Sequence, residues 1–195
     1  MSNRAQEILD FWFGEQTAPA FGQPRKDWFV KSEAFDEQIR EQFEPDIQAA
    51  LAGQLDNWHD NSAPPQTCLA YILLLDQFTR NVYRNTPAMV SGDARALAAA
   101  QSLVASGRDK MLTALERVFV YLPYEHAEDM PAQHESLRLF ASLPPEPNTA
   151  NFIDYARQHF DVVARFGRFP HRNAWLGRNS TPEEEEFLKQ PGSGF

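Results

Sequence analysis

The sequence predicts an all-α protein of stacked antiparallel helical hairpins, in a single domain that covers residues 1–195. Along most of the chain, apolar residues recur with the period of an amphipathic helix. No stretch shows the strict alternation of apolar and polar residues that marks a half-buried strand. Most of the fourteen prolines lie where a helical pattern begins or ends, since there the fixed φ angle and the missing N–H do least harm. Together these observations favour helices joined by short loops.

The predicted elements follow from where these patterns start and stop. Helices are expected over residues 3–13, 33–51, 64–84, 92–106, 113–121, 131–143, 149–167 and from 182 onward, with a further single turn at 124–129. Pro45 should kink or break the second helix, and Pro123 should end the helix that begins at 113. The helix over 64–84 is the most apolar, so we expect it at the centre of the fold.

Three helix starts carry side chains that can accept a hydrogen bond from the first turn. Ser91 can cap the alanine-rich helix, and Asn148 or Thr149 can cap the long helix after the PPEPN break. The clearest signal is the run TPEE at 181–184, which combines an N-cap, a proline at the first helical position and a capping-box glutamate. We therefore expect the acidic run EEEE at 183–186 to be a solvated first turn that favours the helix dipole, not a metal site.

The composition limits the class of protein. The formal net charge of -9 disfavours binding to nucleic acid or to anionic membranes, because both depend on neutralising phosphates with Lys and Arg. No segment approaches the roughly 20 apolar residues of a membrane-spanning helix, and the first residues lack the pattern of a signal peptide. Cys68 is the single cysteine and lies in an apolar run, so no internal disulfide can form. These features predict a soluble cytoplasmic protein.

The first group of polar residues lies on the most apolar helix. At 100° per residue, Asp76 and Arg80 fall on the same stripe as Leu69 and Ile72, and Arg84 continues that row. One interpretation is a buried salt bridge that holds neighbouring helices in register. The other is a cleft in which Arg80 and Arg84 bind an anion while Asp76 orients one of them. The two interpretations are compatible.

The second group lies in the run YLPYEHAEDMPAQHES at 121–136, which contains Glu125, His126, Glu128, Asp129, Gln133 and His134. His126 and Asp129 are one helical turn apart and suit one metal ion, but a catalytic zinc site normally needs three protein ligands. The motifs HExxH and Glu-x-x-His are absent, so we predict no metal and no other cofactor. Carboxylates at helix starts usually act as caps. A role of His126 or Glu125 as a catalytic acid or base stays open.

The third group surrounds a turn at Phe169-Pro170 and contains Arg168, His171, Arg172, Asn173 and Arg178. A proline-fixed turn positions side chains at low entropic cost, and the planar arginine fork matches carboxylate or phosphate. These residues either bind an anionic ligand or fasten the loop to the rest of the protein. His159, on the apolar side of the preceding helix, is expected to be a buried core histidine.

Four runs resemble a known family. They are ILDFWFG (8–14), LLLDQFTRNVYR (73–84), YLPYEHAED (121–129) and RFGRFPHRNAWLGRNSTPEEEEFL (165–188), and they are similar to the hallmark segments of the bacterial family called domain of unknown function 924. The resemblance implies a tetratricopeptide-repeat-like helical fold and a cytoplasmic bacterial protein. It implies no established activity.

Two functions compete on this basis. In the first, the protein is a binding module whose groove holds an acidic peptide or a small anion through Asp76, Arg80, Arg84, Arg168, His171, Arg172 and Asn173. In the second, it is an enzyme for a small anionic substrate, with His126, His171 or Glu125 as acid or base. No nucleophile elbow, phosphate loop or dinucleotide fingerprint is present, which favours binding. A third possibility is a helical oligomer whose arginines pair across a subunit interface, and the sequence leaves the oligomeric state open.

Overall fold

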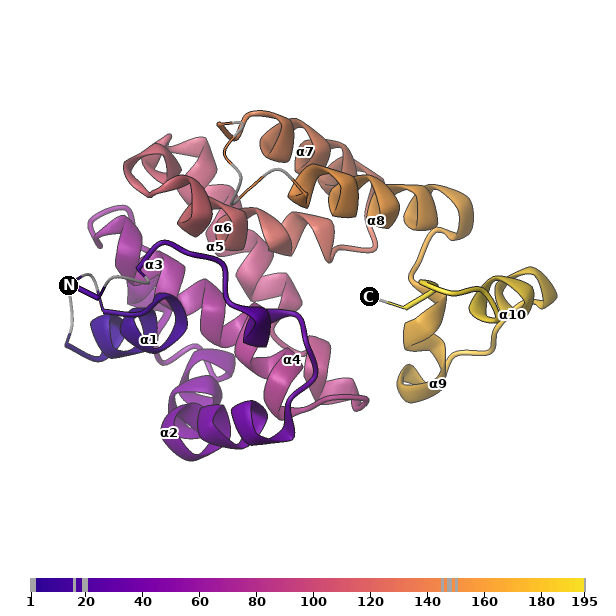
Figure 1. Ribbon diagram of the computed structural model, residues 1–195, viewed down its shortest axis with the longest axis horizontal. Coiled ribbons are helices and arrows are strands. Elements are labelled where there is room, and N and C mark those ends of the chain that lie inside the picture. The colour runs from indigo at the N-terminus through magenta and orange to yellow at the C-terminus, as the bar shows by residue number, and fades with distance from the viewer. Residues whose placement is uncertain are drawn as a thin grey trace.

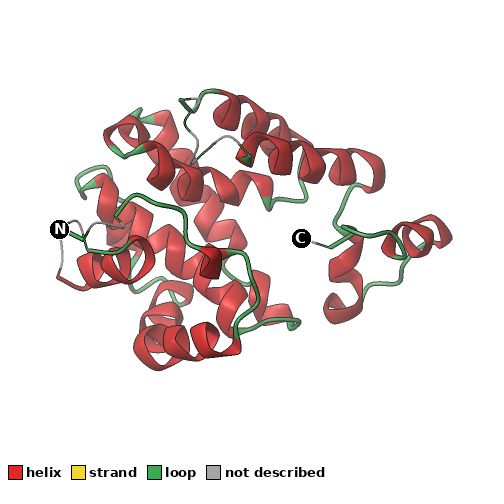
Figure 2. Cartoon of the chain, viewed as in Figure 1, coloured by secondary structure: helices red, strands yellow, loops and turns green. Residues whose placement is uncertain are grey.

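The computed structural model describes residues 3–15, 17–18, 21–144, 146, 149 and 151–194. These residues form helices and loops without a strand (Figure 2), which confirms the all-α class. The α-helices are α1 (Asn3–Phe13), α2 (Glu33–Leu51), α3 (Pro65–Ile72), α4 (Thr79–Val82), α5 (Asp93–Ala105), α6 (Ala114–Glu125), α7 (Met130–Ala141), α8 (Phe152–Phe166), α9 (Asn173–Leu176) and α10 (Pro182–Leu188). In Figure 1, α1 to α6 form a body, α7 and α8 lie along one side of it, and α9 and α10 lie at the far end of α8.

A central helical rod runs through the body (Figure 1). It consists of α3, a π-helical segment at Leu73–Phe78 and α4, and it packs against α1, α2, α5 and α6. Every residue from Thr67 to Thr79 is buried, as expected for a helix that is apolar on two sides. Cys68 lies in this run, where burial raises the pKa of its thiol to about 12. Each fully buried Leu or Ile contributes roughly 1.5–3 kcal/mol to stability, so burial of the rod stabilises the fold substantially.

Aromatic rings fix the N-terminal helix and the following loop to this rod. The ring of Trp12 lies 5.3 to 5.9 Å, between centroids, from the rings of Trp28, Phe35, Phe78 and Phe119. Such pairs contribute about 0.5–1.5 kcal/mol beyond their area burial. The indole N–H of Trp28 also donates to the carbonyl oxygen of Trp12 at 3.0 Å. The short 3₁₀ turn Lys26–Trp28 is thereby held against α1.

Prolines interrupt the helices less than predicted. The structure continues α2 through Pro45, and it continues α6 through Pro123 to Glu125, so the predicted end at 121 is wrong. A proline inside a helix removes one backbone hydrogen bond, but every residue from Val118 to Glu125 is buried. Burial of the surrounding helix offsets that local cost. The helices α6, α7 and α8 then pack consecutively on one another, and their likeness to tetratricopeptide repeats stays a prediction.

Helix caps are also partly as predicted. The N-cap of α5 is Gly92, while the Ser91 hydroxyl donates to the carbonyl of Ala88 at 2.7 Å instead of capping. The N-cap of α8 is Asn151, and Thr149 donates to the Pro144 carbonyl at 2.9 Å. Both predicted caps are therefore wrong, because the helices start one or more residues later than the pattern indicated. Asn148, the other proposed cap, lies outside the described residues.

The C-terminal segment, which we define as residues 165–194, packs against α7 and α8 through a small apolar cluster. Phe169 is buried there with Val162 and Val163 of α8, against Met130, Phe166 and Phe187. The predicted capping box is confirmed: Thr181 Oγ1 accepts the Glu184 N–H at 3.2 Å, and the Glu184 carboxylate accepts the Thr181 N–H at 2.7 Å. That the chain forms a single domain stays a prediction. None of the helices in the described ranges is long and apolar enough to cross a membrane.

Candidate functional site

The candidate site is built around Asp76, on the π-helical segment of the central rod. Its side chain is 0% exposed. One carboxylate oxygen, Oδ1, lies 2.8 Å from Nδ1 of His126 and 3.1 Å from Nη1 of Arg80, and the other accepts a hydrogen bond from Gln77 at 2.6 Å. Such π-helical turns are rare and occur frequently at functional sites. The buried carboxylate therefore joins two helices, the central rod and α6.

Arg80 connects Asp76 to a second carboxylate. The predicted i,i+4 pair with Asp76 forms, but the arginine fork binds Asp93 at the start of α5, with N–O distances of 2.9 and 3.1 Å. Gly92 permits this contact, because a Cβ atom at that position would collide with the Leu75 carbonyl of the π-helical segment. The close approach of α5 thus brings Asp93 to Arg80.

Arg172 lies on the other side of Asp93. It ends the short 3₁₀ turn Pro170–Arg172, and its Nη1 is 3.6 Å from Asp93 Oδ2. The guanidinium stacks on the Phe169 ring at 4.5 Å from the centroid. The residue is 7% exposed, and its Nε donates to no atom in the described part of the chain. A single carboxylate, Asp93, therefore faces two arginines.

A second buried pair links α6 to α8. Nδ1 of His159 lies 2.9 Å from Oε1 of Glu125 and 2.9 Å from the carbonyl oxygen of Tyr155. The ring centroids of His159 and His126 are 6.0 Å apart. The side-chain amide of Gln133 donates to the backbone carbonyl of Glu125 at 2.7 Å and so holds the end of α6 in place. His159 is buried, as predicted, but its partner is an acid from the second polar group.

Burial and neighbouring charges set the protonation states here. Burial alone would raise the pKa of Asp76, but Arg80 and His126 hold it below its ordinary value. The pKa of His126 is lowered, mainly because the ring is buried and also because the positive charge of Arg80 is close. Burial, followed by the charge of Arg172, lowers the pKa of His171 to about 4. The pKa of Arg172 is lowered to about 10, mainly because the side chain is buried and also because the positive charge of Arg80 is close. At neutral pH the positive charge of the site thus comes from arginine, while His126 and His171 are neutral.

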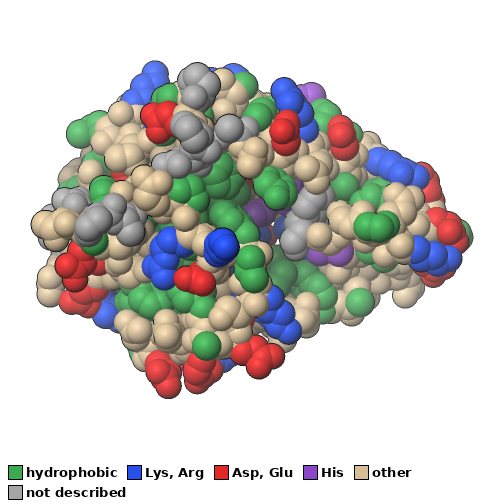
Figure 3. Space-filling model, viewed as in Figure 1, with side chains coloured by type: hydrophobic (Ala, Val, Ile, Leu, Met, Phe, Trp, Pro, Cys, Tyr) green, Lys and Arg blue, Asp and Glu red, His purple; other side chains and the backbone are tan. Residues whose placement is uncertain are grey.

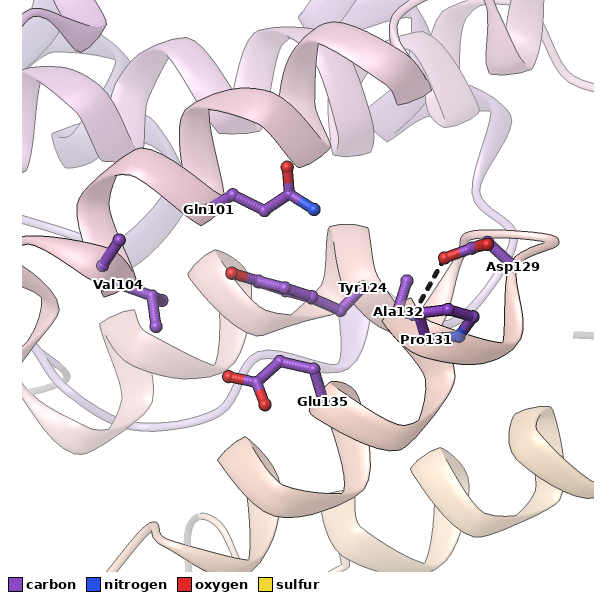
Figure 4. A pocket seen from close by; sticks show the side chains of 8 residues that line it. Gln101, Val104, Tyr124, Asp129, Pro131, Ala132 and Glu135 are labelled. Carbon is purple, nitrogen blue, oxygen red and sulfur yellow. Dashed lines mark hydrogen bonds between the residues drawn. The ribbon is translucent and has the colours of Figure 1, made fainter.

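One face of the molecule is hollowed (Figure 3). Figure 3 shows a hollow between the body and the C-terminal segment, with histidine and Lys or Arg side chains visible inside it. A separate groove of about 340 Å³ lies between α5, α6 and α7 (Figure 4). Its charged lining residues, Asp129 and Glu135, are both acidic, and Asp129 already accepts the Ala132 N–H at 2.9 Å. The arginines around Asp93 are therefore a better candidate for binding an anion than this acidic groove.

Comparison with known proteins agrees with this architecture. Residues 8–192 match the family model described as bacterial protein of unknown function (DUF924). The chain belongs to this family. A solved structure, of a protein of unknown function from Agrobacterium tumefaciens, is similar with 38% identity and a TM-score of 0.82, over 95% of this chain and 97% of that chain. No curated protein matches the chain. Membership of DUF924 therefore supports the fold and brings no reaction with it.

In this DUF924 protein the predicted ligand-binding residues divide into two groups. Asp76, Arg80 and Arg172 meet around Asp93, and the His171 ring lies 5.7 Å from the Phe169 ring on which Arg172 stacks. Asp93 was not predicted as a site residue. Its only signal in the sequence is its place in the first turn of the alanine-rich helix.

The other group is already bound by protein partners. Arg84 makes a two-bond fork with Asp36 of α2, at 2.5 and 2.9 Å. Arg168 makes a similar fork with Glu184, at 2.7 and 2.8 Å. Asn173 donates to the Ser180 hydroxyl and accepts from Arg178 Nε, both at 3.0 Å. The contacts of Arg168, Asn173 and Arg178 fasten the C-terminal segment, while the fork of Arg84 fastens α2 to the central rod.

His126 and Asp129, which the sequence spacing would allow to share one metal ion, bind different partners. His126 turns toward Asp76, while Asp129 is the N-cap of α7, which is the capping role that the sequence favoured. Glu128 accepts the Phe169 N–H at 2.8 Å and a fork from Arg178 at 2.6 and 2.9 Å. The second polar group thus contributes side chains to the buried cluster and to the fastening of the C-terminal segment.

Proposed function

We propose that this protein binds a small anionic ligand, one with a carboxylate or phosphate group, at Arg172. The observation that carries the proposal is the incomplete set of partners of a buried arginine. Its Nε donates to no atom of the described residues, and its Nη1 lies 3.6 Å from Oδ2 of Asp93, which is beyond hydrogen-bonding distance. Buried charges are normally paired and fully hydrogen-bonded. An anion at this position would supply the missing charge and acceptor.

The electrostatics support the same conclusion. Asp93 is bound by the fork of Arg80, so it compensates Arg172 only in part. The lowered pKa of Arg172, about 10, means that its surroundings disfavour the charged form. Charge-assisted hydrogen bonds from arginine to carboxylate or phosphate are among the stronger ones in proteins. Arg80, oriented by Asp76, and His171 are the neighbouring groups that we assign to the ligand.

Several features favour a small molecule over an acidic peptide. Arg84 and Arg168, which would extend the binding surface, have their forks occupied by Asp36 and Glu184. Arg172 is 7% exposed, so only a narrow group can reach it. The net charge of -9 disfavours a nucleic acid. In this proposal the protein acts in the cytoplasm, which the lone, buried Cys68 favours.

Isothermal titration calorimetry with phosphate, succinate and citrate tests the proposal. Arg172→Met should weaken binding by more than about tenfold, because it removes a charged donor. The same change should leave the melting temperature unchanged or raised, since it removes an incompletely compensated buried cation. Arg168→Met is the matched control: it should lower the melting temperature, because it leaves Glu184 without its partner, and keep the affinity.

Two outcomes would count against the proposal. One is the absence of heat with all three anions; the other is an Arg172→Met variant that melts earlier and binds as well as the wild type. The latter would make Arg172 a fastening residue like Arg168. A ligand that is bound and then consumed would support the catalytic alternative, with His126, His171 or Glu125 as acid or base.

A further inference from the structure

We propose that Glu125, His126 and His159 bind a divalent transition-metal ion. The proposal does not rest on anion binding at Arg172. Each of the three side chains offers one ligand atom, and these atoms lie within 4.8 Å of one another. Glu125 is the last residue of α6, His126 is its C-cap, and His159 comes from the middle of α8. The set is therefore assembled by helix packing and has no local sequence motif.

Asp76 orients one of the histidines for this role. Its Oδ1 lies 2.8 Å from Nδ1 of His126, which places the proton of a neutral ring on Nδ1 and the lone pair on Nε2. A histidine that ligates a metal almost always donates its other ring N–H in this way, often to a carboxylate. Asp76 is held in turn by Gln77 and Arg80, so the imidazole has a fixed orientation before any ion arrives.

Glu125 provides a second, independent observation. It is 2% exposed, and its Oε2 accepts no hydrogen bond from the described residues. A buried carboxylate oxygen without a donor is costly, because it has lost its hydration without replacement. His159 meets the other oxygen, Oε1, at 2.9 Å. A cation between the carboxylate and the two imidazoles would satisfy Oε2 and keep the three groups together.

The ligand types indicate the class of ion. Imidazole nitrogen with one carboxylate suits zinc or ferrous iron, whereas magnesium and calcium prefer oxygen alone. Ligand atoms on one tetrahedral zinc lie roughly 3.3 Å apart, given Zn–N distances of about 2.0–2.1 Å. The side chains would therefore move inward by about 1 Å, within the reach of rotamer adjustment. Three protein ligands leave one position open to water or a ligand.

Zinc titration of the full chain tests this site. Protein treated with EDTA and dialysed is titrated with Zn²⁺ against a chromophoric chelator, and Co²⁺ absorption reports the coordination geometry independently. We expect one ion per chain. Glu125→Gln and His159→Gln should each weaken zinc binding by more than about 100-fold, and Asp76→Asn by about 10- to 100-fold through the orientation of His126. His134→Gln, an exposed histidine on α7 outside the set, should bind as the wild type does.

The wild type also provides a test that needs no variant. Zn²⁺ should raise its melting temperature, because an ion that binds only the folded state stabilises that state, and it should not raise that of Glu125→Gln. Wild-type protein that takes up no Zn²⁺ and no Co²⁺ would overturn the proposal, as would equal zinc affinity in wild type, Glu125→Gln and His159→Gln. Arg172→Met should bind zinc as the wild type does. The two proposals can therefore fail separately, because loss of anion binding at Arg172 would leave zinc binding unchanged.

Discussion

The body and the C-terminal segment are held by different forces. In the body, every residue from Thr67 to Thr79 is buried, and aromatic rings pack around Trp12. In the C-terminal segment, a small apolar cluster is supplemented by arginine forks on Glu184 and Glu128. Charged groups are frequent in the segment and serve to fasten it. In the body, Asp76 is a fully buried charge, and it pairs with Arg80 inside the apolar packing.

The difference teaches how to tell a fastening arginine from a binding one. Arg168 and Arg178 each meet one carboxylate with two hydrogen bonds, so their charge is compensated within the protein. Arg172 reaches its carboxylate at 3.6 Å and shares it with Arg80. All three arginines lie within eleven residues of one another in the sequence. Only the structure separates them, because it shows that Arg168 and Arg178 are fully paired with a carboxylate and that Arg172 is not.

The largest effect should come from breaking the buried pair of the body. Asp76→Ala and Arg80→Ala should each lower the free energy of unfolding by about 3–5 kcal/mol, because the remaining charge is stranded. Changing both to leucine should recover only part of the loss, since His126 and Asp93 then lose partners. Urea unfolding measures both. Losses below about 1 kcal/mol for the single changes would mean that this face of the rod is solvated.

A second test targets the packing of α5 on the rod. Gly92→Ala should cost about 1–3 kcal/mol, because the new methyl group meets the Leu75 carbonyl, which is backbone and cannot turn away. Gly194→Ala is a suitable control, since its Cβ would meet only the His171 Cβ at 3.9 Å. Thermal and urea unfolding of both variants provide the measurement. Equal stability of the two would show that α5 can shift without loss.

Breaking a fork of the C-terminal segment should have a smaller and local effect. Arg178→Ala should cost about 1–2 kcal/mol, since it removes charged hydrogen bonds to Glu128, each residue being 24% exposed. Hydrogen exchange should rise in the segment and not in the central rod. Arg165→Ala, whose exposed pair with Glu183 has the same charge, should cost less than about 0.5 kcal/mol. A uniform rise in exchange over the whole chain would contradict the division into two regions.

The smallest expected effect is a pH dependence carried by Glu184. Its hydrogen bond with Arg168, with help from the Thr181 N–H, lowers its pKa from 4.5 to about 2. The folded state therefore binds this proton less readily than the unfolded state, and the stabilisation is present above pH 4.5 and lost as the pH falls toward 2. Glu184→Gln should melt earlier than wild type at pH 7 and at nearly the same temperature at pH 2.5. A constant difference across that range would contradict this assignment.

Local features of the structure could be predicted from the sequence. The bounds of α1 and α2, the capping box at Thr181 and the pair of Asp76 with Arg80 depend on residues three or four apart on one helix. Pro123 was misjudged because its burial outweighs its low helix propensity. Features that depend on neighbours along one helix were therefore predicted correctly, whereas a feature that depends on burial by the rest of the fold was not.

Contacts between helices were beyond such reasoning. Asp93 meets Arg80 only because Gly92 allows close packing, and Glu125 meets His159 only because α8 returns along α6. The sequence showed which polar residues were crowded, such as those at 125–129. It could not show which of them face the interior, because that depends on how α6 packs against α8 and the central rod.

The π-helical segment separates chain length from the identity of the buried face. A π turn holds one more residue than an α turn, so deleting one residue from Leu73–Phe78 would allow regular α-helical hydrogen bonds. Because the wider turn absorbs the extra residue, the side chains before and after the deletion would keep nearly the same faces. Arg80 would still face Asp93, and Asn81 would still face Asp36. A relative without this extra residue could therefore be one residue shorter here and enclose the same side chains.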